Sequence, residues 1–320
     1  MMIVQKFGGS SLADRDRIRR AAGISAEARR RGNRLVVVVS AAGDSTDALL
    51  ETAKELHPHP PLRELDALVA TGEQQSAALL AIVLQSMGLA ARSFSGWQAG
   101  IATDPCHGEA AILRVEPRRL LRALDSGEIA VVAGFQGLSP EEEITTLGRG
   151  GSDTTAVALA SALRAERCEI YTDVDGIYTA DPRLIPSARV LPEIDYRDML
   201  HLAEAGSQVL HPASVRLAME HSLPLRLLSS FRAGEGSLVR SLNDLCRPPI
   251  AGVTRDPEHS SVTVVGKAAD AKLAEQLREL LEQRGIPVRD TAQAEGCVTL
   301  TVAPAQLLPA LELCHRAALN

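Results

Sequence analysis

Lys6-Phe7-Gly8-Gly9-Ser10-Ser11 lies directly behind the apolar run Met2-Ile3-Val4. An apolar strand that ends in paired glycines and small hydroxyls is expected to run into a turn. A helical pattern begins at Asp14, so the turn would aim free backbone N–H groups and a helix N-terminus at one point. Phosphate is the natural occupant of that point, and Lys6 adds a mobile cation. Gly-Gly turns also serve geometry alone, so the motif by itself leaves both interpretations open.

The composition indicates a layered α/β protein. The chain has 320 residues, which is enough for one large α/β domain and a smaller module. Hydrophobic residues make up 45% and aromatic residues only 2%, so the core is aliphatic. A formal charge of −6 and few stacking side chains do not suit a single-stranded nucleic-acid surface. We therefore expect no nucleic-acid partner.

The spacing of the cysteines and the hydropathy pattern indicate where the protein is located and whether it binds a metal. The five cysteines are widely spaced, with no Cys-x-x-Cys pair and no zinc spacing with histidine. We expect reduced thiols and no metal site formed by the protein. No apolar stretch approaches the roughly 20 residues of a membrane span, and the N-terminus has the pattern of a strand. These features predict a cytoplasmic protein with no membrane partner.

Strand and helix patterns alternate along the first 229 residues. This alternation predicts a mainly parallel sheet with helices on both faces, which is a three-layer αβα sandwich. The predicted strands include residues 34–39, 91–94, 129–135, 168–172 and 223–229, and the predicted helices include residues 14–31, 117–126 and 196–205.

Two further stretches lie where ligands bind in open α/β sheets. The run Arg34–Val39 ends in Ser40-Ala41-Ala42-Gly43-Asp44-Ser45-Thr46-Asp47, at the carboxyl end of a buried strand. A hydroxyl there would also cap the next helix, and capping is compatible with ligand contact. From Leu68 the chain enters Thr71-Gly72-Glu73, which places Glu73 in the first turn of a helix. Interaction with the helix dipole is its alternative role.

The stretch Leu147-Gly148-Arg149-Gly150-Gly151-Ser152-Asp153 is the most informative. Three glycines surround Arg149, and Ser152 is placed to cap an Ala-rich helix that runs to Arg164. This pattern predicts a second helix N-terminus that faces an anion. Arg149 has no local acidic partner, which favours substrate recognition over structural pairing.

Three aspartates follow the predicted strand Cys168–Thr172, at positions 173, 175 and 181. A calcium loop is not predicted, because the closing Glu of a twelve-residue loop is absent. Turn chemistry explains Asp175-Gly176 and Asp181-Pro182 equally well.

A composition shift at residues 243–249 indicates a linker between two domains. Beyond it, strands are predicted at 261–265, 286–289 and 297–302, and helices at 271–284 and 304–317. A βαββα module of about 70 residues is too small to be stable without neighbours, so we expect it to pair with another copy. The predicted organisation is a catalytic domain at 1–242, a linker at 243–249 and a single small α+β module at 250–320.

Taken together, the motifs resemble those of the amino acid kinase family, and within it the aspartate kinases. The resemblance covers roughly residues 2–240, in family order, and the C-terminal module is similar to the ACT domain of these enzymes. It rests on Lys6-Phe7-Gly8-Gly9-Ser10-Ser11, Val39-Ser40-Ala41-x-Gly43-x-x-Thr46-Asp47, Gly72-Glu73, Gly134-Phe135-Gln136-Gly137, Thr146-Leu147-Gly148-Arg149-Gly150-Gly151-Ser152-Asp153 and Thr172-Asp173-Val174-Asp175-Gly176-Ile177-Tyr178-Thr179-x-Asp181-Pro182-Arg183.

The resemblance implies transfer of the γ-phosphate of MgATP to the side-chain carboxylate of L-aspartate, giving 4-phospho-L-aspartate and ADP. This would be the first step toward lysine, threonine and methionine, with Mg²⁺ held mainly through the nucleotide phosphates. Lys6 would hold the transferring phosphate and Asp153 would orient Lys6. The implied site residues are Lys6, Arg149 and Asp153 for catalysis, Ser40, Thr46, Glu73, Arg149 and Ser152 for aspartate, and Lys6, Gly8, Gly9, Ser10, Thr172, Asp173, Tyr178, Asp181 and Arg183 for the nucleotide.

The sequence also departs from the family pattern. Gln208 and Leu228 stand where many aspartate kinases carry lysine and arginine, and Gly266–Asp270 lacks the Pro-Gly of an effector-binding ACT loop. Aspartate kinases usually carry two ACT modules, and this chain has room for about one. We therefore expect the module chiefly to form a homodimer or a higher homo-oligomer. Two alternatives are another phosphotransferase of the family and a catalytically weak, amino-acid-binding regulatory protein.

Overall fold

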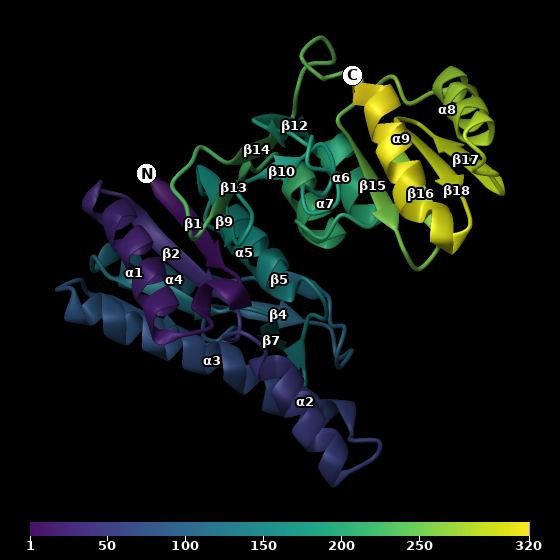
Figure 1. Cartoon of the computed structure of the whole chain (residues 1–320). Coiled ribbons are helices and arrows are strands. Elements are labelled where there is room, and N and C mark those ends of the chain that lie inside the picture. The colour runs from purple at the N-terminus through teal and green to yellow at the C-terminus, as the bar shows by residue number, and fades with distance from the viewer. Residues whose placement is uncertain (320) are drawn as a thin grey trace. The chain divides into compact units, whose positions relative to one another are not determined.

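The computed structural model describes residues 1–319, which form two compact units (Figure 1). The first unit comprises Met1–Asp175 and Leu223–Gly234, and the second comprises Gly176–Ser222 and the chain from Glu235 onward. Each unit has its own apolar core. A compact unit is not the same thing as a domain that folds alone, so the predicted boundaries at 242 and 250 stay a prediction.

The first unit is built on six parallel strands in the order β13-β9-β1-β2-β6-β3. The continuous apolar run of β2 is buried on both faces, as expected for a central parallel strand. The mainly parallel α/β sheet predicted from the sequence is therefore confirmed. The strands are β1 (Met2–Phe7), β2 (Arg34–Val39), β3 (Ala91–Phe94), β6 (Ile129–Ala133), β9 (Arg167–Thr172) and β13 (Leu225–Ser229).

Helices cover both faces of this sheet. Successive side chains of β1 point to opposite faces, so neighbouring residues contact different helices. Gln5 accepts a hydrogen bond from Ser25 of α1, whereas Lys6 pairs with Asp153 of α5. Helix α1 begins after Asp14, whose carboxylate accepts from the backbone N–H groups of the first turn. The helices of this unit are η1 (Gly9–Leu12), α1 (Arg15–Arg30), α2 (Ser45–Leu56), α3 (Leu62–Ser86), α4 (Arg118–Asp125) and α5 (Gly151–Ala162).

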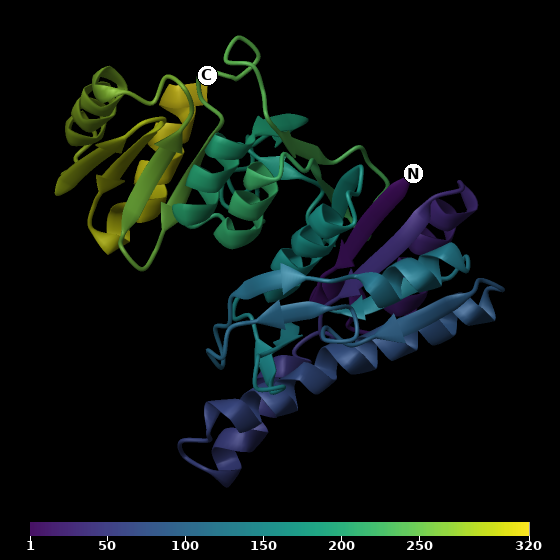
Figure 2. The ribbon, with the colours of Figure 1, turned by 180° about the vertical axis from the view of Figure 1, so that it is seen from behind.

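Helix α3 runs along the sheet and packs on the same face as α1 (Figure 2). Its length corrects two expectations. Glu73 lies in the middle of this 25-residue helix, because the helix already begins at Leu62, directly after Pro60-Pro61. Among residues 1–319, α3 is also the one helix long and apolar enough to span a membrane, although half of its most apolar window is buried inside the protein. Core helices of folded domains can have the same length and composition, so α3 alone is weak evidence for a membrane span.

A smaller four-stranded sheet completes the first unit, in the order β5-β4-β7-β8. Strand β8 leads directly into the loop that carries Arg149. Its strands are β4 (Ile101–Thr103), β5 (Ile112–Val115), β7 (Gln136–Leu138) and β8 (Ile144–Thr146).

The second unit combines a helical segment with a four-stranded antiparallel sheet of order β15-β16-β18-β17. Helices α8 and α9 contribute to the core of this sheet, and α9 lies against it in Figure 1. The elements are β10 (Ile177–Tyr178), β11 (Val190–Leu191), β12 (Glu193–Asp195), α6 (Tyr196–Glu204), α7 (Pro212–Glu220), β14 (Ser237–Arg240), β15 (Gly252–Asp256), β16 (Ser261–Val265), α8 (Ala271–Gln283), β17 (Asp290–Ala294), β18 (Cys297–Thr301), η2 (Pro304–Gln306) and α9 (Leu307–Leu319).

The C-terminal module differs from its predicted βαββα order. Strand β15 precedes the first predicted strand, so the observed order is ββαββα. The strand predicted at 286–289 lies at Asp290–Ala294 instead, where all five residues are exposed. An exposed edge strand carries no apolar alternation, which is the signal that locates strands in a sequence.

Candidate active site

The glycine turn after β1 is held by backbone contacts with two neighbouring segments. Gly8 N donates to Tyr171 O, and Gly9 O accepts from Gly43 N at 3.0 Å. A Cβ on Gly9 would lie 2.9 Å from Ala41 O, so only glycine fits against the turn after β2. The turn therefore sits at the carboxyl ends of β1, β2 and β9, where parallel α/β sheets bind their ligands.

Lys6 and Asp153 join the two turns that the sequence singles out. Lys6 Nζ lies 2.7 Å from Asp153 Oδ1, and both side chains are largely buried. A Cβ on Gly8 would lie 3.4 Å from the same Nζ, which places the ammonium group directly beside the glycine turn. A largely buried cation next to a glycine turn is chemically suited to a phosphoryl group.

The second turn enters α5 without a side-chain cap. Gly150 is the N-cap residue and has a φ of 71°, in the left-handed region that glycine tolerates. Ser152 lies inside the helix and packs against Gly134, where a Cβ would come within 2.9 Å of Ser152 Oγ. The predicted capping role of Ser152 is therefore wrong, because the helix begins at Gly151, two residues earlier than a cap at Ser152 would require.

Glu73 reaches the turn after β2 from the middle of α3. Its Oε1 accepts a hydrogen bond from Ala41 N at 3.0 Å. Gly72 makes this approach possible, because a Cβ there would lie 2.9 Å from the Cβ of Ala41. Thus the Ser40–Gly43 turn touches both the glycine turn and Glu73.

One oxygen of Glu73 is left for a ligand. Its Oε2 is buried and has no hydrogen-bond partner among residues 1–319, and the same holds for the hydroxyl of Ser76 one turn later. Burial raises the pKa of Glu73 to about 7, against the lowering effect of the Ala41 N–H. An ammonium group at Oε2 would satisfy this carboxylate and favour its charged form.

Arg149, Thr46 and Ser40 are the residues of the predicted aspartate site whose side chains are exposed or half-buried. Arg149 is exposed and makes no hydrogen bond or ion pair with any residue that the structure describes. Thr46 is half-buried in the first turn of α2, and the hydroxyl of Ser40 lies at the end of β2. Ser10, which is predicted to contact the nucleotide, is exposed on η1. The guanidinium is therefore available for a substrate carboxylate.

The predicted nucleotide residues fall into both units. Thr172 and Asp173 belong to the first unit, where Thr172 Oγ1 donates to Asp173 Oδ1 at 3.0 Å. Tyr178, Asp181 and Arg183 belong to the second unit. The Arg183 guanidinium lies 2.8 Å from Asp181 and holds the pKa of that carboxyl below its usual range.

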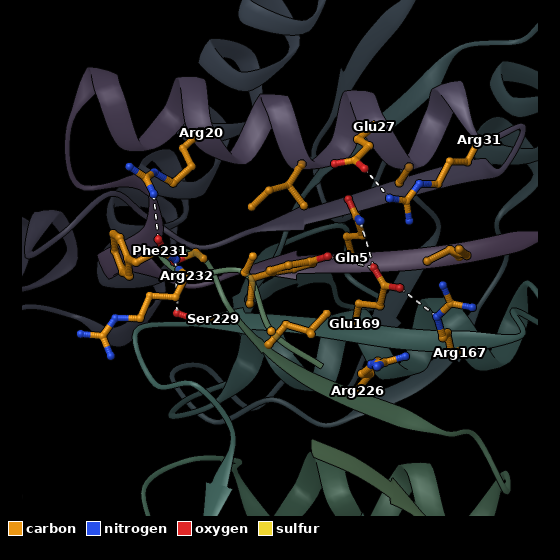
Figure 3. A pocket seen from close by; sticks show the side chains of 18 of the residues that line it. Gln5, Arg20, Glu27, Arg31, Arg167, Glu169, Arg226, Ser229, Phe231 and Arg232 are labelled. Atoms are coloured by element: carbon orange, nitrogen blue, oxygen red, sulfur yellow. Dashed lines mark hydrogen bonds and ion pairs between the residues drawn. The ribbon is translucent and has the colours of Figure 1, made fainter. Parts of the chain in front are cut away.

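A cavity of about 570 Å³ lies on the opposite face of the sheet from Lys6. It is lined by α1, β1, β9, β13 and the loop after β13 (Figure 3). Several of its side chains pair with each other: Glu169 accepts from Gln5 and Arg167, and Glu27 pairs with Arg31. No predicted site residue lines it, so we do not assign the phosphate or aspartate site to this cavity.

Sequence reasoning missed two groups that shape the site. Ser11 donates to Ser230 Oγ at 2.8 Å, and Ser230 N donates to Thr172 O, which fixes the glycine turn to the ends of β9 and β13. Asp66, two turns before Glu73 on α3, is buried and accepts several hydrogen bonds. The seven-residue spacing to Glu73 was the available signal, since it places both carboxylates on one helix face.

Comparison with known proteins places these motifs in a family. A model described as "Amino acid kinase family" matches residues 1–229. Aspartokinase from Thermus thermophilus is 48% identical over 287 residues, which is 90% of this chain and 71% of that protein. Aspartokinase from Mycolicibacterium smegmatis is 50% identical over 269 residues, which is 83% of this chain and 64% of that protein.

Solved structures give the same picture. Aspartate kinase from Synechocystis superposes with a TM-score of 0.69 and 38% identity, covering 98% of this chain and 54% of the other. E. coli aspartokinase III, in complex with aspartate and ADP, superposes with a TM-score of 0.70 and 27% identity, covering 98% of this chain and 84% of the other. This chain thus spans less than two thirds of some relatives, and the likenesses support aspartate kinase function.

Proposed function

Because the chain belongs to the amino acid kinase family, we propose that it transfers the γ-phosphate of MgATP to the β-carboxylate of L-aspartate. The products would be 4-phospho-L-aspartate and ADP, in amino-acid biosynthesis in the cytoplasm. One observation carries the proposal: the Lys6–Asp153 ion pair, at 2.7 Å, brings together the glycine turn after β1 and the helix N-terminus that follows Arg149.

In this proposal, Lys6 and the N–H group of Gly9 hold the transferring phosphoryl group. The N–H of Gly8 already donates to Tyr171 O, so Gly8 contributes through the shape of the turn. Asp153 fixes the ammonium group of Lys6 from the other side. The aspartate carboxylate is already ionised near pH 7, so the reaction needs no general base to create its nucleophile. Catalysis is then mainly alignment of the two reactants and stabilisation of charge on the phosphoryl oxygens.

Aspartate itself would be held by groups with free capacity. Glu73 Oε2 offers a buried acceptor to the substrate ammonium, and the Arg149 guanidinium offers donors to a carboxylate. Thr46, Ser40 and Ser152 would complete the pocket. A site with both a buried acceptor and an arginine suits an α-amino acid better than a simple carboxylate.

The nucleotide would contact Ser10, Thr172, Asp173, Tyr178, Asp181 and Arg183. Among the described residues, no three His, Cys, Asp or Glu side chains gather as metal ligands, so we propose that Mg²⁺ is held mainly by the nucleotide phosphates. When bound there, Mg²⁺ neutralises phosphate charge in the transition state. We also propose that the C-terminal module pairs with another copy of the chain.

An acceptor-dependent kinase assay tests this function. The purified chain is incubated with MgATP and aspartate, glutamate, a homologous acid or no acceptor, and ADP release is measured. Hydroxylamine is added in parallel to trap an acyl phosphate as the hydroxamate. We expect ADP and hydroxamate with aspartate alone. Equal ADP release without an acceptor, or with every acid, would sink the proposal.

A further inference from the structure

Asp66 is a buried carboxylate with no role in the proposed chemistry. It lies on α3 and is 2% exposed. Its Oδ2 lies 2.7 Å from His107 Nδ1, and Gly108 N donates to both oxygens at 3.2 and 3.1 Å. Thr146 Oγ1 donates to Oδ1. Both oxygens are therefore fully engaged, which offsets the cost of burying a carboxylate.

The donors to Asp66 come from two segments that are far apart in the sequence. His107 and Gly108 belong to the loop after β4, whereas Thr146 is the last residue of β8. The two segments also contact each other, because Ala110 N donates to Thr146 O at 2.8 Å. Asp66 thus binds both segments to α3 at one point.

These two segments flank the loop that carries Arg149. Thr146 lies three residues before Arg149, and Gly148 packs against the other segment: a Cβ on Gly148 would lie 3.3 Å from Gly108 O. Leu147 N donates to Phe135 O at 2.9 Å, so the backbone on this side of Arg149 is fixed. The Arg149 side chain has no partner of its own among residues 1–319. Its position therefore depends on the backbone of this loop.

We propose that Asp66 is a positioning residue for Arg149, acting through its hydrogen bonds to Thr146, His107 and Gly108. It holds the loop in the geometry that presents the guanidinium to the carboxylate of aspartate. The inference rests on the proposed function, since it assigns Asp66 to the binding of one substrate and not the other. Loss of the Asp66 contacts should weaken aspartate binding and leave ATP binding unchanged.

The substitution Thr146→Val tests the contact with the least disturbance. Valine has nearly the shape of threonine but removes the donor to Asp66. We expect the KM for aspartate to rise about tenfold, as for loss of one hydrogen bond to a charged group, with the KM for ATP within twofold of the wild type. Thr146→Ser keeps the hydroxyl and should restore the KM. Aspartate binding measured by calorimetry should follow the same order.

A matched control lies one residue away. Thr145 Oγ1 is 2.5 Å from Thr103 Oγ1, and both side chains are buried without touching Asp66. Thr145→Val should lower the melting temperature as much as Thr146→Val but leave both KM values unchanged. Equal KM changes in the two variants would show that Asp66 is merely structural.

A second variant, at His107, tests the same contact in case Thr146→Val does not fold. His107 is partly exposed, and His107→Phe keeps a ring while removing its donor to Asp66. It should raise the KM for aspartate selectively. An unchanged KM for aspartate in this variant and in Thr146→Val overturns the positioning role. Absence of aspartate-dependent ADP release in the wild type would instead overturn the proposed function, so the two failures are distinguishable.

Discussion

Asp66 and Glu73 are two buried carboxylates on one face of α3, two turns apart, and they are satisfied very differently. Asp66 accepts from a ring nitrogen, a backbone N–H and a hydroxyl. Glu73 accepts from Ala41 N alone, and its Oε2 has no partner among the described residues. Both side chains are at most 3% exposed, so burial does not distinguish them.

This difference separates a structural carboxylate from one that can bind a substrate. A carboxylate whose oxygens are all engaged stabilises the loops around it and has nothing left for a substrate. A buried oxygen with no partner is costly, and a ligand that satisfies it recovers that free energy. Glu73 fits the second description, and its raised pKa has the same cause.

The largest expected effect concerns the ion pair between Lys6 and a third carboxylate, Asp153. Lys6→Ala should lower turnover by about 10² to 10³, as for the loss of one preorganised charge donor beside the reacting phosphate. Steady-state kinetics with saturating ATP and aspartate measure this. Lys54→Ala, on the exposed surface of α2, is the control and should retain wild-type turnover. Near-normal turnover in Lys6→Ala would remove this residue from the mechanism.

Substitution of Glu73 and of Asp66 by the matching amide should change the stability of the chain in opposite directions. Glu73→Gln should increase the free energy of unfolding at pH 8, because the pKa of Glu73 is about 7 in the folded state against an ordinary value of 4.5. The folded state binds the proton more tightly, so its stability falls as the pH rises from about 4.5 to 7. The free energy of unfolding of Glu73→Gln should exceed that of the wild type by about 3 kcal/mol at pH 8, and this gain should vanish below about pH 4.5.

Asp66→Asn is the counterpart and should lower the free energy of unfolding by about 2 kcal/mol, since it breaks a satisfied buried network. Urea denaturation of both variants at pH 5 and pH 8 compares them directly. The comparison of the two carboxylates breaks down if Glu73→Gln destabilises the chain at pH 8 as Asp66→Asn does. Glu73→Gln should also weaken aspartate binding, which separates its stability from its function.

The smallest effect concerns the glycine that lets α3 approach the turn after β2. Gly72→Ala should destabilise the chain by about 2 kcal/mol, because its Cβ would lie 2.9 Å from the Cβ of Ala41. Gly23→Ala is the matched control on α1, where a Cβ meets nothing within 4 Å and should stabilise by about 1 kcal/mol. Thermal unfolding of both variants measures the difference. Similar stabilities would mean that the α3 contact tolerates displacement.

The sequence predicts the elements whose signal is local. The run Leu35–Val39 is apolar throughout, and Asp14 marks the start of α1, so the sequence predicts both elements to within a residue or two. The alternation of such elements was enough for the parallel sheet. Strand β17 was misplaced because its exposed residues carry no such signal, and its pairing with β18 depends on tertiary contacts.

The candidate site shows the same limit. The glycine turn and Arg149 follow from motifs, because glycines and a cation at fixed spacing imply an anion. The sequence predicts Glu73 in the first turn of a helix, whereas it lies in the middle of α3. The glycine before it, Gly72, suggests a helix start, but it allows α3 to approach Ala41 closely. His107 and Asp66 are 41 residues apart, and no local pattern announces that two such residues meet.

The register of β1 limits the insertions and deletions that this strand can tolerate. Lys6 lies opposite Val38 of β2 and Ile170 of β9, and its neighbours Gln5 and Phe7 face the α1 side of the sheet. Inserting or deleting one residue within the strand would exchange the two faces and place glutamine where the phosphate would bind. Changes in chain length are therefore expected in the loops on either side of β1 and not within the strand.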